Sequence, residues 1–131
     1  MESKSCPFCT LPDERIVDQN DLALVIRDGF PVSPGHTLVI PKRHVGSFFE
    51  LNEEEIASMM ALLKSAKSVL DVEFKPESYN IGINDGPQAG QTVPHVHMHL
   101  IPRYAGDVAD PRGGVRWLIP DKADYWSGRQ G

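Results

Sequence analysis

Long apolar runs and cysteines are both scarce in this chain of 131 residues. No stretch approaches the roughly 20 consecutive apolar residues that cross a bilayer. The N-terminus carries no apolar run of the secretory kind. We therefore expect a cytoplasmic protein that makes no membrane contact. In that setting, Cys6 and Cys9 are expected to be reduced or bound to a metal rather than joined in a structural disulfide.

Positive charge is limited as well. Lys and Arg number 13 against 18 Asp and Glu, which gives a formal net charge of −5. A broad nucleic-acid-binding surface needs clustered Lys and Arg, so a nucleic-acid polymer is not an expected partner. The chain also lacks the G-x-G-x-x-G and G-K-[ST] elements, so neither a dinucleotide-binding fold nor a P-loop is supported. A small anionic ligand held by a local site is compatible with this balance.

The order of apolar runs and turns predicts one α+β domain with an antiparallel sheet. Residues 22–26 and 36–40 are short apolar runs joined by a turn-rich loop, which favours antiparallel pairing. Asn52, followed by three glutamates, predicts a capped helix that runs to about Val72. Residues 79–84 and a strand that begins near residue 94 form a predicted hairpin. The whole chain, 1–131, is expected to be a single domain with its core at about 6–107, and the order of the tail at 108–131 is left open.

Three histidines alternate with apolar residues in the run Pro94-His-Val-His-Met-His-Leu-Ile-Pro102. This period of two is typical of a half-buried strand, which places the imidazoles of His95, His97 and His99 in a row on one face. The apolar residues expected to face the core are Val96, Met98 and Leu100. The first and third imidazoles lie about 13 Å apart along a regular strand, too far for one metal ion to hold both. At least one imidazole is left for other work, such as nucleophilic or acid–base catalysis.

The segment Cys6-Pro-Phe-Cys9 has the spacing of a zinc-binding pair. Two thiolates do not fill a tetrahedral site, so two of the five histidines must complete it if zinc is bound. An unligated pair of reduced thiols is an alternative. A second alternative is a metal enzyme in which His95 and His97 bind the metal directly.

The glycine-rich turn at 85–92 indicates the class of ligand. Gly86, Gly90, Gln91 and Thr92 place backbone N–H groups, an amide and a hydroxyl beside the imidazoles. Such neutral donors gather phosphate oxygens and stabilise charge as it develops on them. Taken singly, four other polar residues are more often structural than functional: Asp28, His36, His44 and Asn84.

These segments together resemble the histidine-triad (HIT) family. His95-Val-His-Met-His-Leu-Ile101 is similar to its motif of three histidines separated by apolar residues, and Pro34-Gly-His-Thr-Leu-Val-Ile-Pro-Lys-Arg-His44 is similar to its second signature segment. Residues 85–93 and 101–107 resemble the branch that includes the fragile histidine triad protein and many bacterial relatives. The resemblance extends from about residue 6 to residue 107.

The resemblance implies a hydrolase that acts at the α-phosphate of dinucleoside polyphosphates such as diadenosine tri- or tetraphosphate. His97 would be the nucleophile and form a covalent nucleotidyl-histidine, which water then hydrolyses. The other implied catalytic residues are His36, Gln91 and His99. The implied substrate-binding residues are Ile26 in the base pocket, Asp28 on the ribose, and Asn84, Gly90, Gln91, Thr92 and His99 around the phosphates. Alternatives are an adenosine 5′-phosphoramidate hydrolase of the same family and a non-catalytic, zinc-containing nucleotide-binding protein.

The resemblance also implies architecture and partners. The expected fold is a five-stranded antiparallel sheet with one long helix and a short helix, in a chain that forms a homodimer. One structural zinc per chain would be held by Cys6, Cys9, His44 and His95, with no organic cofactor. The expected ligand is a purine nucleotide.

Overall fold

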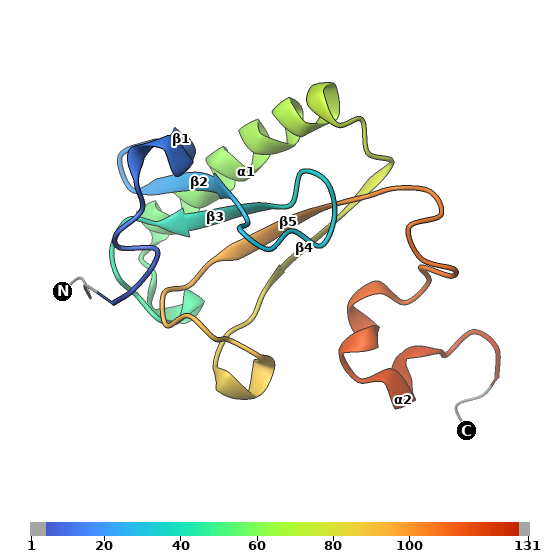
Figure 1. The fold of residues 1–131 in the computed structure, drawn as a ribbon. Coiled ribbons are helices and arrows are strands. Elements are labelled where there is room, and N and C mark those ends of the chain that lie inside the picture. The colour runs from blue at the N-terminus through green and yellow to red at the C-terminus, as the bar shows by residue number, and fades with distance from the viewer. Residues whose placement is uncertain (1–4, 129–131) are drawn as a thin grey trace.

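The computed structural model describes residues 5–128 and contains a five-stranded antiparallel sheet in the order β1-β2-β3-β5-β4 (Figure 1). The strands are β1 (Ile16–Gln19), β2 (Ala23–Arg27), β3 (Thr37–Pro41), β4 (Ser78–Ile83) and β5 (Met98–Arg103). Both predicted antiparallel pairs are present, as β2 with β3 and β4 with β5. With one long helix and one short helix, this sheet confirms the predicted α+β fold.

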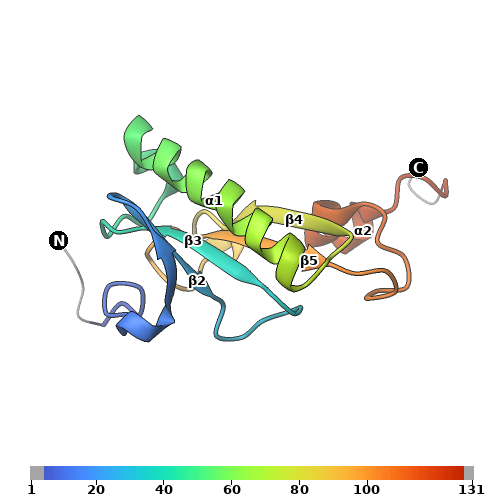
Figure 2. The same ribbon diagram turned by 90° about the horizontal axis from the view of Figure 1, so that it is seen from above.

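The long helix α1 (Glu53–Glu73) covers one face of the sheet, as Figure 2 shows. It begins with the predicted capping box, in which Asn52 accepts the Glu55 backbone N–H at 2.8 Å and Glu55 accepts that of Asn52 at 3.0 Å. The buried apolar residues of α1 that join the main core are Met59, Leu62, Ala66 and Leu70. Because this face is closed by the helix, functional side chains of the sheet must lie on the opposite face.

The opposite face is covered only in part. Over β2 and β3, the N-terminal segment packs on a second buried cluster, formed by Leu24, Ile26, Leu38 and Ile40 beneath Phe8, Leu11 and Ile16. The β4–β5 end of this face is bordered by the C-terminal segment, which lies below the sheet when α1 is drawn above it (Figure 1). Between these two segments lie His97 and His99, whose side chains are both partly exposed.

The histidine-bearing strand starts later than predicted. It was expected from about residue 94, but regular pairing begins only at Met98. Pro94 has no N–H to donate to a ladder. The Val96 N–H instead donates to the Val45 carbonyl at 2.7 Å, in the loop after β3. The backbone at His95 is therefore irregular, and its carbonyl is available to a side chain.

The predicted alternation of burial holds from Val96 to Leu100 but fails at His95, whose imidazole is fully buried. The inward apolar residues of this segment, Val96, Met98 and Leu100, all belong to the main core. His97 and His99 are half-buried between them. Both imidazoles therefore lie on the face of the sheet that α1 leaves uncovered.

The C-terminal segment folds back on itself. A 3₁₀ helix (Gly114–Leu118) leads into α2 (Pro120–Ala123), and the Arg116 guanidinium donates to the Ala123 carbonyl at 2.9 Å and to that of Lys122. The Arg112 guanidinium lies 4.8 Å from the centre of the Trp126 ring. Residues 129–131 of the predicted tail, like residues 1–4, lie outside the described part of the chain. Among the described residues, no helix is both long and apolar enough to span a membrane.

Candidate active site

The His97 ring is held in one tautomer by the irregular backbone before β5. Its Nδ1 lies 2.9 Å from the carbonyl oxygen of His95. A carbonyl oxygen only accepts hydrogen bonds, so Nδ1 carries the proton of the neutral ring. The lone pair of Nε2 is therefore available, which is the state that a nucleophilic imidazole requires.

A chain of hydrogen bonds that begins at the Val32 backbone fixes the tautomers of His36 and His99. The Val32 backbone N–H donates to His36 Nδ1 at 3.1 Å, so the proton of neutral His36 lies on Nε2. That Nε2–H faces His99 Nδ1 at 2.9 Å and Asp28 Oδ2 at 3.4 Å. His99 accepts this hydrogen bond at Nδ1, so the N–H of its own neutral ring is on Nε2. The rings of His97 and His99 then present complementary groups, a lone pair and an N–H, with their centres 5.2 Å apart.

Burial favours the neutral forms of the His36 and His99 imidazoles. It lowers the pKa of His36 below its usual 6.5, against an opposing effect of Asp28. Burial also lowers the pKa of His99, and the neighbouring His97 and His36 lower it further, while Asp28 opposes them. Near neutral pH, both rings can therefore keep the fixed tautomers described above.

These lowered pKa values predict that the folded protein loses stability in mild acid. The free energy of unfolding should fall as the pH drops from 6.5, the ordinary histidine pKa, through the lower folded-state values, because the unfolded chain binds more protons in that window. Urea unfolding of wild type and His36→Asn at several pH values between 7 and 5 measures this. The fall should be smaller in the variant, which lacks one of the two perturbed imidazoles. Equal slopes in the two proteins would contradict the prediction.

A second cluster, formed by Cys6, Cys9, His44 and His95, has the donor set of a tetrahedral metal site, with its ligand atoms within 4.8 Å of one another. His95 Nδ1 lies 3.5 Å from each thiol sulfur, and His44 Nδ1 lies 3.1 Å from that of Cys9. Zinc–sulfur and zinc–nitrogen bonds at a tetrahedral angle place the two ligand atoms about 3.6 Å apart. The spacing of these side chains therefore fits zinc.

The tautomer of His95 fits a metal too. Its Nε2 lies 2.7 Å from the Pro41 carbonyl, so Nε2 carries the proton and Nδ1 turns a lone pair toward the thiols. Donation of the second ring N–H to a carbonyl is the usual support of a metal-bound histidine. The residues present therefore fit the expected zinc in both spacing and protonation.

Asp28, His36 and His99 also bring three potential ligand atoms within 4.8 Å, but their protonation does not suit a metal. A neutral imidazole bound through Nε2 must carry its proton on Nδ1, whereas Nδ1 of His36 accepts the Val32 N–H. This trio is suited to hydrogen bonding. His97 belongs to neither cluster, so the alternative in which His95 and His97 share a metal gains no support.

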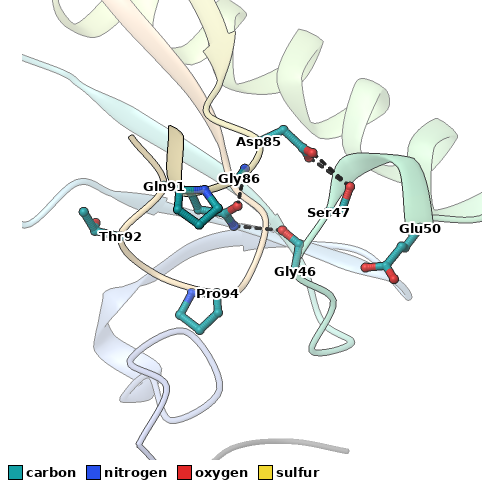
Figure 3. Close-up of a pocket in the computed structure, with 9 residues that line it drawn as sticks. Gly46, Ser47, Glu50, Asp85, Gly86, Gln91, Thr92 and Pro94 are labelled. Carbon is teal, nitrogen blue, oxygen red and sulfur yellow. Dashed lines mark hydrogen bonds between the residues drawn. The ribbon is translucent and has the colours of Figure 1, made fainter. Parts of the chain in front are cut away.

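The glycine-rich turn encloses a cavity beside the histidine segment. The cavity has a volume of about 340 Å³ and is lined by Gly46, Ser47, Glu50, Asp85, Gly86, Pro87, Gln91, Thr92 and Pro94 (Figure 3). No imidazole borders it. Thr92 is exposed, and the backbone at Gly90 has a φ of 95°, which favours glycine. Gly86, Gln91 and Thr92, which the sequence predicts to gather phosphate oxygens, line this cavity, and Gly90 is absent from its lining.

Gln91 holds the turn together. Its side-chain amide donates to the carbonyls of Gly46 at 2.8 Å and Val93 at 3.0 Å, and its oxygen accepts the Gly86 N–H at 2.8 Å. Figure 3 shows this amide between the two loops. Both of its N–H groups are engaged, so direct donation to a phosphate, as expected from the sequence, would require one of these bonds to exchange. Asn84 is half-buried.

Comparison with known proteins identifies the family. The family model of the HIT domain matches residues 11–106. The chain belongs to the HIT family. It is 42% identical over 80 residues to the bis(5′-nucleosyl)-tetraphosphatase [asymmetrical] of Schizosaccharomyces pombe, a match that covers 61% of this chain and 44% of that protein. The match thus spans less than half the length of that relative.

Solved HIT structures have the same fold. A HIT family protein from Bacillus anthracis aligns with a TM-score of 0.74 and 35% identity, over 81% of this chain and 78% of that one. A histidine triad family protein from Mycobacterium smegmatis, described as Zn-bound, aligns with a TM-score of 0.72 and 35% identity, over 81% of this chain and 80% of that one.

Two side chains near the triad differ from the sequence-based picture of a HIT site. Ile26, expected in the base pocket, is fully buried in the apolar cluster of β2 and β3, with Leu24, Leu38 and Ile40, and offers no surface to a ligand. Phe8 instead lies against His97, with the ring centres 5.1 Å apart and the planes at 71°. The only sequence signal for Phe8 is its position between Cys6 and Cys9, the two cysteines of the possible metal site.

Proposed function

We propose that this HIT protein is a nucleotide hydrolase that cleaves dinucleoside polyphosphates at the α-phosphate through a covalent nucleotidyl-histidine on His97. The observation that carries this proposal is that His97 and His99 have opposite tautomers, with the proton on Nδ1 of His97 and on Nε2 of His99. The Nδ1–H of His97 donates to a carbonyl, which leaves Nε2 as a nucleophile, and the chain through His36 leaves His99 with a donor. Binding alone does not require a free nucleophile, which weighs against the non-catalytic alternative.

In the first step, the Nε2 lone pair of His97 attacks the α-phosphorus. The P–N bond forms as the P–O bond to the departing polyphosphate breaks, and the electron pair leaves with that oxygen. The ring gains positive charge as Nε2 becomes bonded to phosphorus. The His95 carbonyl, 2.9 Å from Nδ1, stabilises that charge through a stronger hydrogen bond. The N–H of His99 donates to a phosphate oxygen, where negative charge develops.

In the second step, water attacks the same phosphorus from the side that the polyphosphate has left. A P–O bond forms, the P–N bond breaks, and the electron pair returns to Nε2 while the water proton passes to solvent. A neutral nucleophile avoids the repulsion that a carboxylate would meet at an anionic phosphorus centre. One oriented site therefore serves both displacements.

The remaining predicted contacts place the bound nucleoside on the β2–β3 side of His97. Asp28 accepts the Phe30 N–H at 2.8 Å through Oδ1, and its Oδ2 has room to accept from a ribose hydroxyl beside His36. The predicted phosphate contacts of Asn84, Gly90, Gln91 and Thr92 stay part of the proposal, as does a purine base. The name of the S. pombe relative supports the dinucleoside polyphosphate over the phosphoramidate.

Mass spectrometry tests the covalent step directly. Protein mixed with diadenosine tetraphosphate and quenched within milliseconds to seconds should carry one added AMP, and peptide mapping should place it on His97. An adduct on another residue, or full turnover without any adduct under conditions that preserve phosphohistidine, would contradict the mechanism.

We further propose one structural zinc per chain, held by Cys6, Cys9, His44 and His95. The fit of spacing and tautomer supports it, and the Zn-bound neighbour from M. smegmatis is consistent with it. When bound by these residues, zinc would supply a structural crosslink at this position. These four residues tie the N-terminal segment to the backbone that orients His97.

A homodimer is also proposed. Several large apolar side chains are half or more exposed on α1, β4 and the C-terminal segment, including Val72, Ile81, Leu118 and Ile119. A second copy of the chain would cover surface of this kind. Sedimentation equilibrium should give twice the chain mass of 14.5 kDa, whereas a monomer at micromolar concentration would contradict the proposal.

A further inference from the structure

We propose that the departing half of the substrate runs along β4 and β5, with its nucleoside in a cavity between these strands and the C-terminal segment. This inference rests on the proposed function and names a second binding region for it. The ligand class is the nucleoside of the departing half, which the leaving phosphates join to the attacked α-phosphate until the P–O bond breaks.

The sheet register leaves space beside His99 on one side only. On the active-site face, His99 is paired with Leu38 of β3 and with Gly82 of β4. Leu38 is buried beneath the N-terminal segment. A side chain at Gly82, by contrast, would meet no atom within 4 Å of its Cβ. With the attacked nucleotide at Asp28, the open route for the leaving group passes over Gly82.

That route leads to a cavity of about 290 Å³ at the end of the same two strands. Asn80 lies on the same face of β4 as Gly82, two residues and about 7 Å away from it. A Cβ on Gly114 would approach the Asn80 amide to 3.5 Å, so the C-terminal segment forms the outer wall here. Arg103 lies four residues from His99 on the same face of β5, about 13 Å away. A polyphosphate and a ribose can bridge this span.

The charges of the cavity suit a nucleoside better than the phosphates themselves. Arg103 is already paired, with Nε 2.7 Å and Nη2 3.0 Å from the Asp107 carboxylate and Nη1 2.6 Å from Asn80 Oδ1. Glu77 adds a second carboxylate to the lining. A pocket with two carboxylates and one neutralised guanidinium repels phosphate, whereas its oxygens can accept from the hydroxyls and amines of a nucleoside.

Two variants test this placement without altering the histidines. Gly82→Val fills the open side of the route with a residue that strands favour. Gly114→Asn narrows the cavity wall at a φ of 49°, which asparagine tolerates. For each, kcat/KM is measured with diadenosine tetraphosphate and with adenosine 5′-phosphoramidate, whose leaving group is only ammonia. The ratio of the first value to the second should fall about tenfold or more, because only the dinucleotide needs this region.

The ratio separates this inference from the proposed function. A ratio that stays at the wild-type value in both variants, whether or not both activities fall together, would overturn the second binding region. A wild-type protein that cleaves neither substrate would instead overturn the proposed function. Gly82→Ala, with a smaller side chain, should give an intermediate ratio if the effect is steric.

Discussion

Replacing His97 with asparagine is expected to lower kcat for diadenosine tetraphosphate by about 10³-fold or more, with little change in nucleotide affinity. The asparagine amide can still donate to the His95 carbonyl, as Nδ1 of His97 does at 2.9 Å. It has no basic nitrogen to attack phosphorus. The fold and the binding surface are kept while the P–N bond becomes impossible. Rapid-quench kinetics should show no burst of leaving nucleotide, and AMP binding should be measurable by calorimetry.

His99→Asn serves as the matched comparison, since it removes a donor rather than the nucleophile. Removal of one stabilising donor typically lowers kcat by about 10²- to 10³-fold. The covalent adduct should still form in this variant, only more slowly. Turnover by His97→Asn near that of wild type would end the covalent proposal. Loss of AMP binding in that variant would instead mean that His97 is needed to shape the site.

The elements of the fold were predictable where their causes are local in the chain. Asn52 and Glu55 specify the start of α1 through a capping box whose two members lie three positions apart in the chain. Alternating apolar residues specify the inward side of β5, and turn-rich loops specify the pairing of neighbouring strands. The late start of β5 was missed because it depends on a hydrogen bond from Val96 to Val45, 51 residues earlier in the chain.

The chemistry of the site was predictable in its residue types but not in its protonation. The sequence places three histidines together, but their tautomers follow from backbone groups at Val32, Pro41 and His95. No side-chain pattern encodes these contacts. The same reason applies to Gln91: its amide reads as a phosphate donor in the sequence, whereas in the fold it is engaged by two carbonyls.

Cys6→Ser is expected to have the second largest effect, on stability rather than on chemistry. The four clustered side chains join the N-terminal segment to positions 35 to 89 residues away. Metal binding of this kind is part of the free energy of folding. A serine hydroxyl is a much poorer zinc ligand, so bound zinc should fall well below one per chain. The melting temperature should drop by on the order of 10 °C, as a loss of a few kcal/mol implies.

Removal of zinc with a chelator shows whether the drop in melting temperature comes from loss of the metal or from loss of the thiol itself. Wild type stripped of metal should melt near Cys6→Ser, and added zinc should restore wild type but not the variant. The N-terminal segment also carries Phe8, whose ring lies against His97, and covers Ile26 and Leu38. Its release should therefore lower activity together with stability. Full zinc content and an unchanged melting temperature in Cys6→Ser would show that the cluster holds no structural metal.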